Sequence, residues 1–158
     1  MKKNRTFLSL VATLCVSAIC GMASQNCLAQ SLAHLVALSP VPQEVTWGNN
    51  TFKTPRNIVL VGADEADVDA IALLRKNFSE GKKGVQVVIG ERGDKAVSTY
   101  TEQIPNKVEG YYINVGKNKV VIAGNDEAGT YYGVQTFLQM VSQPKMKQAE
   151  VKDWPDVL

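Results

Sequence analysis

Carboxylate pairs are the side chains whose types and spacing come closest to a catalytic arrangement in this sequence. The pairs are Asp64 with Glu65, Asp126 with Glu127, and Asp153 with Asp156. Two positioned carboxyl groups suffice for glycoside hydrolysis, because one protonates the leaving oxygen while the other acts at the anomeric carbon or on a neighbouring group. The first question is whether the surrounding sequence gives these acids a structural reason to be there.

A structural reason exists for two of the three pairs. Asp64–Glu65 and Asp126–Glu127 each precede an apolar helical stripe, where carboxylates favour the positive end of the helix dipole. Asp153 and Asp156 flank a Trp-Pro dipeptide, a mixture of acid and aromatic typical of carbohydrate sites, but they lie near the end of the sequence with no cleft in evidence. We therefore assign no catalytic residue.

Other kinds of site lack the residues that they require. The single histidine, His34, is expected to be a solvated residue, and all three cysteines precede residue 28. A metal cluster or a Cys/His or Ser/His nucleophile therefore cannot be built in the folded part. Gly90–Asp94 lacks the spacing of a phosphate-binding loop, and its Arg92-Gly93-Asp94 tripeptide, known from cell adhesion, is short enough to arise by chance. We expect no cofactor and no metal.

The stretch 109–143 predicts two strands, a turn and a helix. Tyr111–Val115 and Lys119–Ala123 are rich in aromatic and β-branched residues and enclose a Gly-Lys-Asn turn, which is typical of a hairpin. Asn125 or Asp126 then caps a helix. Its apolar stripe consists of Ala128, Tyr131, Val134, Leu138 and Val141, with Tyr132 and Phe137 widening it. We expect this stripe to face a sheet.

Further strands are predicted on both sides of that stretch. Val41–Trp47 indicates an entry strand that reaches a turn at Gly48–Asn50. Asn57–Gly62 has the continuous apolar run of a strand buried on both faces or at the sheet centre, and Val85–Ile89 is a third apolar strand. After a polar loop over 142–148, Ala149–Pro155 is expected to be extended.

A second helix is predicted between Asp64 and Gly81, with Val68, Ile71, Leu74 and Phe78 on one stripe. The polar segment from Gly90 to Pro105 predicts a short helix or a turn. This order of elements indicates an α/β arrangement, a mixed β-sheet with two main helices packed on one face.

The first 29 residues predict a secretory signal peptide. Three basic residues precede an apolar run over 7–22, and residues 27–29 offer small side chains for cleavage before Gln30. The run is shorter than the roughly 20 residues of a membrane-spanning helix, and the residues before the cysteines do not match a lipidation signal. We expect an exported mature chain, periplasmic or extracellular, without a transmembrane helix.

The mature chain has about 129 residues and no cysteine, enough for one domain to bury a core without disulfides. The signal holds three of the 17 basic residues, which leaves 14 against 15 acidic residues and changes the net charge from +2 to −1. Because no basic stripe remains, nucleic acid and anionic membranes are not expected partners.

Several segments resemble the amino-terminal domain of exported bacterial β-N-acetylglucosaminidases and β-hexosaminidases. They are Val41–Val45, Glu109–Tyr112, Ala123–Gly133, Gln135–Gln139 and Val151–Pro155, of which the stretch GTYYGVQTFLQ is the most specific. The O-GlcNAcase type, glycoside hydrolase family 84, looks closest, followed by family 20. The resemblance implies a non-catalytic α/β domain that precedes a (β/α)₈ barrel, and the barrel holds the acids that work with the substrate's acetamido group.

The resemblance divides the chain into a signal peptide (1–29), a loose arm (30–40), the α/β domain (41–148) and the start of a linker to the barrel (149–158). The family's catalytic acids have no matching position here. The expected function is therefore that of an accessory domain whose partner is the catalytic barrel of the same protein. The alternative is an independent exported module that binds glycans or a protein through exposed aromatics such as Trp47 and Trp154.

Overall fold

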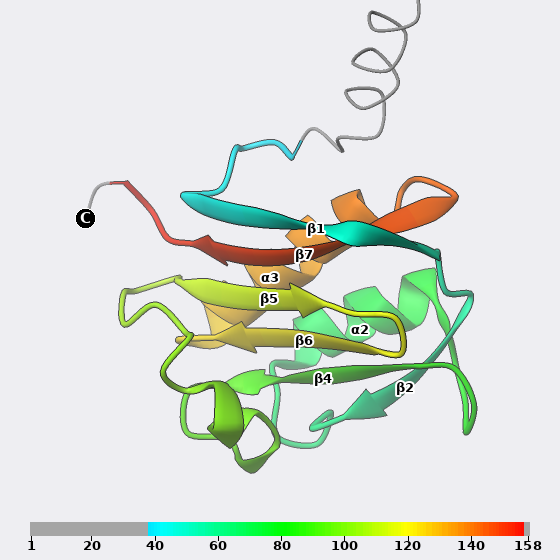
Figure 1. Cartoon of the computed structure of the whole chain (residues 1–158). Helices are drawn as coiled ribbons and strands as arrows, with labels where there is room; N and C mark the ends of the chain where they lie inside the picture. The colour runs from blue at the N-terminus through cyan, green and yellow to red at the C-terminus, as the bar shows by residue number, and fades with distance from the viewer. Residues whose placement is uncertain (1–37, 157–158) are drawn as a thin grey trace, which may run out of the picture. The chain divides into compact units, whose positions relative to one another are not determined.

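A computed structural model describes residues 38–156, so the signal peptide, His34 and most of the predicted arm lie outside the described residues. The described part forms a seven-stranded sheet with two α-helices and one 3₁₀ helix (Figure 1). The elements are β1 (Glu44–Lys53), β2 (Asn57–Val61), α2 (Val68–Asn77), β3 (Ser79–Glu80), β4 (Val85–Glu91), η1 (Lys95–Tyr100), β5 (Tyr111–Val115), β6 (Lys119–Gly124), α3 (Glu127–Met140) and β7 (Lys145–Asp153).

The sheet is mixed, with the order β1-β7-β5-β6-β4-β2-β3. β3, β2, β4 and β6 run parallel to one another, while β5 is antiparallel to both β6 and β7, and β1 is antiparallel to β7. The predicted hairpin is therefore present as β5 and β6. Because β1 pairs with β7, the first and last strands of the described chain lie side by side.

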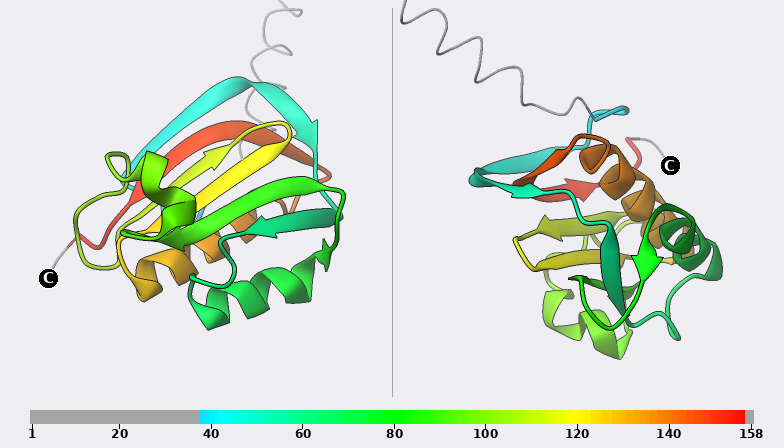
Figure 2. Two further views of the ribbon diagram at one scale, coloured as in Figure 1. Left: turned by 90° about the horizontal axis from the view of Figure 1, so that it is seen from below. Right: turned by 90° about the vertical axis from the view of Figure 1, so that its right-hand side faces the viewer.

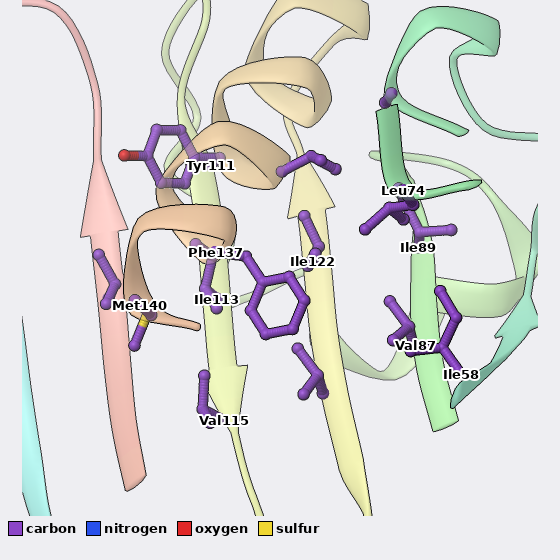
Figure 3. Packing of buried hydrophobic residues seen from close by; sticks show 14 of the residues in the cluster. Ile58, Leu74, Val87, Ile89, Tyr111, Ile113, Val115, Ile122, Phe137 and Met140 are labelled. Carbon is purple, nitrogen blue, oxygen red and sulfur yellow. The ribbon is translucent and has the colours of Figure 1, made fainter. Parts of the chain in front are cut away.

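Both α-helices cover one face of the sheet, as predicted (Figure 2). Alternate residues of the central strands face them, so that Ile113, Ile122 and Ile89 enter one core with Phe137 of α3 and Leu74 of α2 (Figure 3). The opposite face carries a smaller cluster of Val88, Val121, Tyr112, Val97 and Ile104, where η1 and the chain after it supply the cover.

Helix α3 has the predicted position, but its buried face is rotated from the predicted stripe. The residues that face the sheet are Gly129, Thr130, Gly133, Val134, Thr136, Phe137 and Met140. Tyr131, Leu138 and Val141 are half-buried at the margin of the core, and Tyr132 is exposed. Small side chains cause the rotation, because the helix backbone comes so close to the chain at Gly110 that a Cβ on Gly129 would lie 2.3 Å from the Gly110 carbonyl oxygen.

Helix α2 begins four residues later than the prediction placed it. Asp67 is its N-cap, with the carboxylate accepting from the backbone N–H of Ala70 at 2.7 Å. Asp64 lies in a turn that precedes the helix, and Val68 is 79% exposed instead of facing the core. The prediction started the helix at the first of several acids, and composition alone does not distinguish which acid caps it.

Three predictions about strands were also wrong. β1 continues through the expected turn at Gly48–Asn50, where an irregularity in its pairing with β7 absorbs the extra residues. β2 lies next to the short edge strand β3, and only Ile58 of its five residues is fully buried. β7 begins at Lys145, within the segment expected to be a loop.

Candidate functional site

A hollow of about 350 Å³ lies where the chain entering β1 runs beside the chain leaving β7. We call it the Asp153 hollow. Helix α3 forms its third wall. Its lining residues are Ser39, Pro40, Val41, Gln43, Glu109, Tyr111, Tyr132, Gln135, Thr136, Gln139, Asp153, Trp154, Pro155 and Asp156. The expectation that Asp153 and Asp156 have no cleft is therefore wrong, because the entry segment that completes it is distant in sequence.

The carboxylate of Asp153 is held by two donors. Its Oδ1 accepts from the backbone N–H of Gln43 at 3.1 Å, and its Oδ2 accepts from the hydroxyl of Tyr111 at 2.9 Å. Since the single phenolic proton points to the carboxylate, the hydroxyl of Thr136, 2.7 Å away, is the donor to the Tyr111 oxygen. Burial raises the pKa of Tyr111 well above its usual range, and the nearby Asp153 raises the pKa further.

The same walls are tied together at two further points. Gln139 of α3 exchanges two hydrogen bonds with the backbone of Ser39, at 2.9 and 3.1 Å. The side-chain amide of Gln43 donates to Asp156. Leu38, at the end of the predicted arm, is 7% exposed. The segment from Leu38 to Gln43 is thus attached both to α3 and to the chain that leaves β7.

This geometry gives Asp153 a structural task. Both of its oxygens accept hydrogen bonds from groups of the fold, one from the entry segment and one from β5. A general acid or base must instead reach a substrate atom and exchange a proton with it. The arrangement at Asp153 therefore holds three chain segments together.

The other two acidic pairs also have structural positions. Asp126 caps α3 as predicted, with Oδ1 accepting from Gly129 N at 2.8 Å. Its Oδ2 accepts from the N–H of Glu109 at 2.8 Å, which holds that residue at a φ of 60°. The carboxylate of Glu65 accepts from the N–H of Lys95 at 3.2 Å and so links the turn before α2 to the start of η1.

The Arg92-Gly93-Asp94 tripeptide is part of the fold. The Arg92 guanidinium donates to the carbonyl oxygens of Thr101 and Ile104 at 3.2 and 2.5 Å, and to Asn125 Oδ1 at 2.8 Å. Asp94 Oδ2 accepts from the N–H of Glu91 at 2.7 Å. Burial, and then the surrounding acids, raise the pKa of Glu91. Both charged side chains of the tripeptide thus bind groups of the fold, which gives them a structural role.

A second hollow, which we call the Arg92 hollow, shares Trp154 with the Asp153 hollow as a lining residue. Its volume is about 630 Å³, and Arg92, Lys107 and Lys152 line it together with Glu44 and Glu102. The ammonium group of Lys107 lies 4.3 Å from the centre of the Trp154 ring. Trp154 therefore lines two hollows that differ in charge, because the Arg92 hollow has both basic and acidic side chains whereas the Asp153 hollow has only acidic ones.

Both tryptophans of the alternative hypothesis are half-buried, and each has a lysine near its ring. Trp47 packs against the main core, and Lys147 lies 5.8 Å from its ring centre. Trp154 is half-buried, with Lys107 over one face. Stacking on a sugar requires a free aromatic face, and burial together with the nearby lysine reduces the free surface of each ring, so this arrangement does not favour glycan binding through these two residues.

No helix within residues 38–156 is long and apolar enough to cross a membrane. Within the same residues, no three His, Cys, Asp or Glu side chains are grouped so as to hold a metal ion.

Residues 35–154 match the sequence model of a protein family described as glycosyl hydrolase family 20, domain 2. The chain is 26% identical over 159 residues to a beta-hexosaminidase of Porphyromonas gingivalis (strain ATCC BAA-308 / W83), covering 99% of this chain and 20% of that protein. The chain thus spans about a fifth of the length of this relative.

Solved structures share the fold. The structure described as CpGH84B is 26% identical, with a TM-score of 0.64, over 77% of this chain and 23% of that one. The beta-N-acetylhexosaminidase from Bacteroides fragilis NCTC 9343 is similar in fold, with a TM-score of 0.53 and 16% identity over 78% of this chain and 26% of that one. In each of these proteins, about three-quarters of the chain lies outside the part that matches this fold.

Proposed function

The chain belongs to the family of domain 2 of glycosyl hydrolase family 20, an accessory domain of hexosaminidases, and we propose that its parent protein is an exported β-N-acetylglucosaminidase whose catalytic barrel lies outside this chain. The observation that carries the proposal is the family match over residues 35–154, which is nearly the whole of the described domain. The barrel would supply the acids that act with the acetamido group of the substrate.

The structural positions of the acids support this division of labour. Asp126 caps a helix, Asp94 closes a turn and Asp153 joins three segments of the chain. If these carboxylates turned toward a substrate, the domain would lose the stabilising hydrogen bonds that they now accept. The proposal therefore assigns folding and positioning to this domain and hydrolysis to the barrel.

The proposed substrate is a glycan with a terminal β-linked N-acetylglucosamine. The names of the relatives support it, since they are hexosaminidases. Export to the periplasm or the outside rests on the basic and apolar segment that opens the sequence. In that compartment the enzyme would take part in glycan breakdown.

The experiment is a hydrolysis assay on the protein encoded by the same gene with any reading frame that continues after residue 158. We expect release of the chromogenic group from a β-N-acetylglucosaminide and much less from the matching β-glucoside, which lacks the acetamido group. The Asp153→Asn variant of the same protein, if it folds, should keep this selectivity. A folded full-length protein that hydrolyses neither compound, or that prefers the β-glucoside, would refute the proposal.

A further inference from the structure

The charges that line the Asp153 hollow all have one sign. Glu109, Asp153 and Asp156 contribute carboxylates, and no lysine or arginine is among the residues that line it within 38–156. Asp153 is satisfied by Gln43 and Tyr111, whereas one oxygen of Asp156 accepts a single bond from Gln43. Coulombic attraction in such a recess favours a cation.

Apolar side chains are concentrated at the same place. Four large apolar residues between 38 and 156 are conspicuously exposed, namely Val41, Val68, Val108 and Tyr132. Two of them line the Asp153 hollow, with Val41 83% exposed on the entry segment and Tyr132 43% exposed on α3. Exposed apolar surface beside a recess is typical of a binding surface.

The walls of the hollow are preformed. Gln139 fixes Ser39, Gln43 fixes the chain at Asp153, and Asp126 fixes the backbone of Glu109. Fixed walls reduce the conformational entropy that a partner must overcome on binding. The hollow therefore has the rigidity of a docking site as well as its charge and apolar surface.

We propose that the Asp153 hollow is the docking site for a basic side chain of the catalytic barrel, an arginine or lysine whose apolar stem contacts Val41 and Tyr132 while its charged group faces Asp156 and Glu109. This inference rests on the proposed function and adds to it the place and the chemistry of the contact. A long basic side chain is the residue type that combines an apolar stem with a positive head.

The path of the chain favours the barrel over other occupants. Trp154, Pro155 and Asp156 all line the hollow, so residues that follow Asp156 in a longer protein start beside it. Attachment next to the site gives such a segment a high effective concentration there. A free sugar or a second copy of this chain lacks that advantage.

The test is amide hydrogen exchange of the full-length protein beside the isolated chain from residue 30 to 158. We expect the amides of Ser39, Val41, Gln43 and residues 130–136 to exchange at least about tenfold more slowly in the full-length protein, because docking must open before these amides exchange. Val41→Lys should remove that difference, because it places a positive charge beside the site where the basic side chain would dock. The control is Val68→Lys, a similarly exposed valine away from the hollow, which should leave the difference intact.

Each other outcome overturns the inference. Equal exchange in the two proteins means that nothing of the barrel docks at the hollow. If the amides of the isolated chain become more protected as the protein concentration rises, a second copy of the chain occupies the hollow. If they become protected only when N-acetylglucosamine is added, the hollow is a sugar site. The hydrolysis assay is independent of this measurement. A full-length protein that is active but does not protect the amides around the hollow from exchange would therefore refute the docking inference and leave the proposed function in place.

Discussion

The hydroxyl of Tyr111 donates a 2.9 Å hydrogen bond to the carboxylate of Asp153 across the boundary between β5 and β7. The tyrosine ring belongs to the core, while its hydroxyl reaches the margin where the chain leaves the sheet (Figure 3). Asp153 in turn binds the backbone of Gln43. This pair therefore connects the core to both ends of the described domain.

Removal of this hydroxyl should destabilise the domain. In Tyr111→Phe the carboxylate loses one donor and Thr136 loses its acceptor, so we expect the free energy of unfolding to fall by about 1 to 3 kcal/mol. Urea denaturation measures this change. Tyr132→Phe is the control, because that ring is on the exposed side of α3 and its hydroxyl should matter by less than about 0.5 kcal/mol. Equal effects of the two substitutions would contradict the role given to the pair.

Alkaline pH should weaken the fold through the same residue. Burial raises the pKa of Tyr111 in the folded state above the ordinary value of 10.0. Above about pH 10 the unfolded chain therefore loses this proton while the folded chain keeps it, so the free energy of unfolding falls by up to about 1.4 kcal/mol per pH unit. Denaturation between pH 9 and 11 should show a shallower fall for Tyr111→Phe than for the unaltered protein. Parallel curves would be inconsistent with this titration.

The rotated face of α3 gives a contrast between neighbouring residues. Phe137 is fully buried and stacks on Phe78 with ring centres 5.9 Å apart, so Phe137→Ala should cost about 3 to 5 kcal/mol. Leu138 is half-buried at the margin of the core, and Leu138→Ala should cost about 1 to 2 kcal/mol. Thermal unfolding of the two variants compares them. A larger loss of stability in Leu138→Ala than in Phe137→Ala would instead support the buried stripe predicted from the sequence.

Glycine at position 129 should be irreplaceable. Alanine inside a helix is normally favoured over glycine by about 1 kcal/mol. At position 129 we expect alanine to be less stable than glycine, because the new Cβ would lie 2.3 Å from the backbone oxygen of Gly110. Gly129→Ala should lower the free energy of unfolding by about 1 to 3 kcal/mol. Gly81→Ala is the control, since nothing lies within 4 Å of the added atom. Denaturation that finds Gly129→Ala as stable as the unaltered chain would disprove the close approach.

The sequence was sufficient for elements whose pattern is local. The hairpin Tyr111–Val115 and Lys119–Ala123 followed from aromatic and β-branched runs around a turn, and α3 followed from its cap and its spacing. The face of α3 did not, because glycine and threonine carry little hydrophobic signal although they permit the closest packing. Likewise the position of β2 next to the edge strand β3 depends on which strands pair, and an apolar run alone does not encode this.

The Asp153 hollow depends on contacts between distant residues. Gln43 and Asp153 are 110 positions apart, and Ser39 and Gln139 are 100 apart. Position in the sequence suggested that Asp153 lies at an open end, whereas the pairing of β1 with β7 brings the entry segment over it. The family resemblance supplied the accessory role, which neither composition nor spacing of the acids indicates.

The central claim is that this domain does not itself hydrolyse glycosides, and an assay of residues 30–158 alone tests it most directly. Hydrolysis needs a positioned acid and a group that stabilises the reacting acetamido function, whereas the carboxylate of Asp153 is bound by Gln43 and Tyr111. The account predicts no release of the chromogenic group from a β-N-acetylglucosaminide above the buffer rate. Turnover by the isolated domain that is abolished in Asp153→Asn or Asp156→Asn, with the fold intact by circular dichroism, would contradict it.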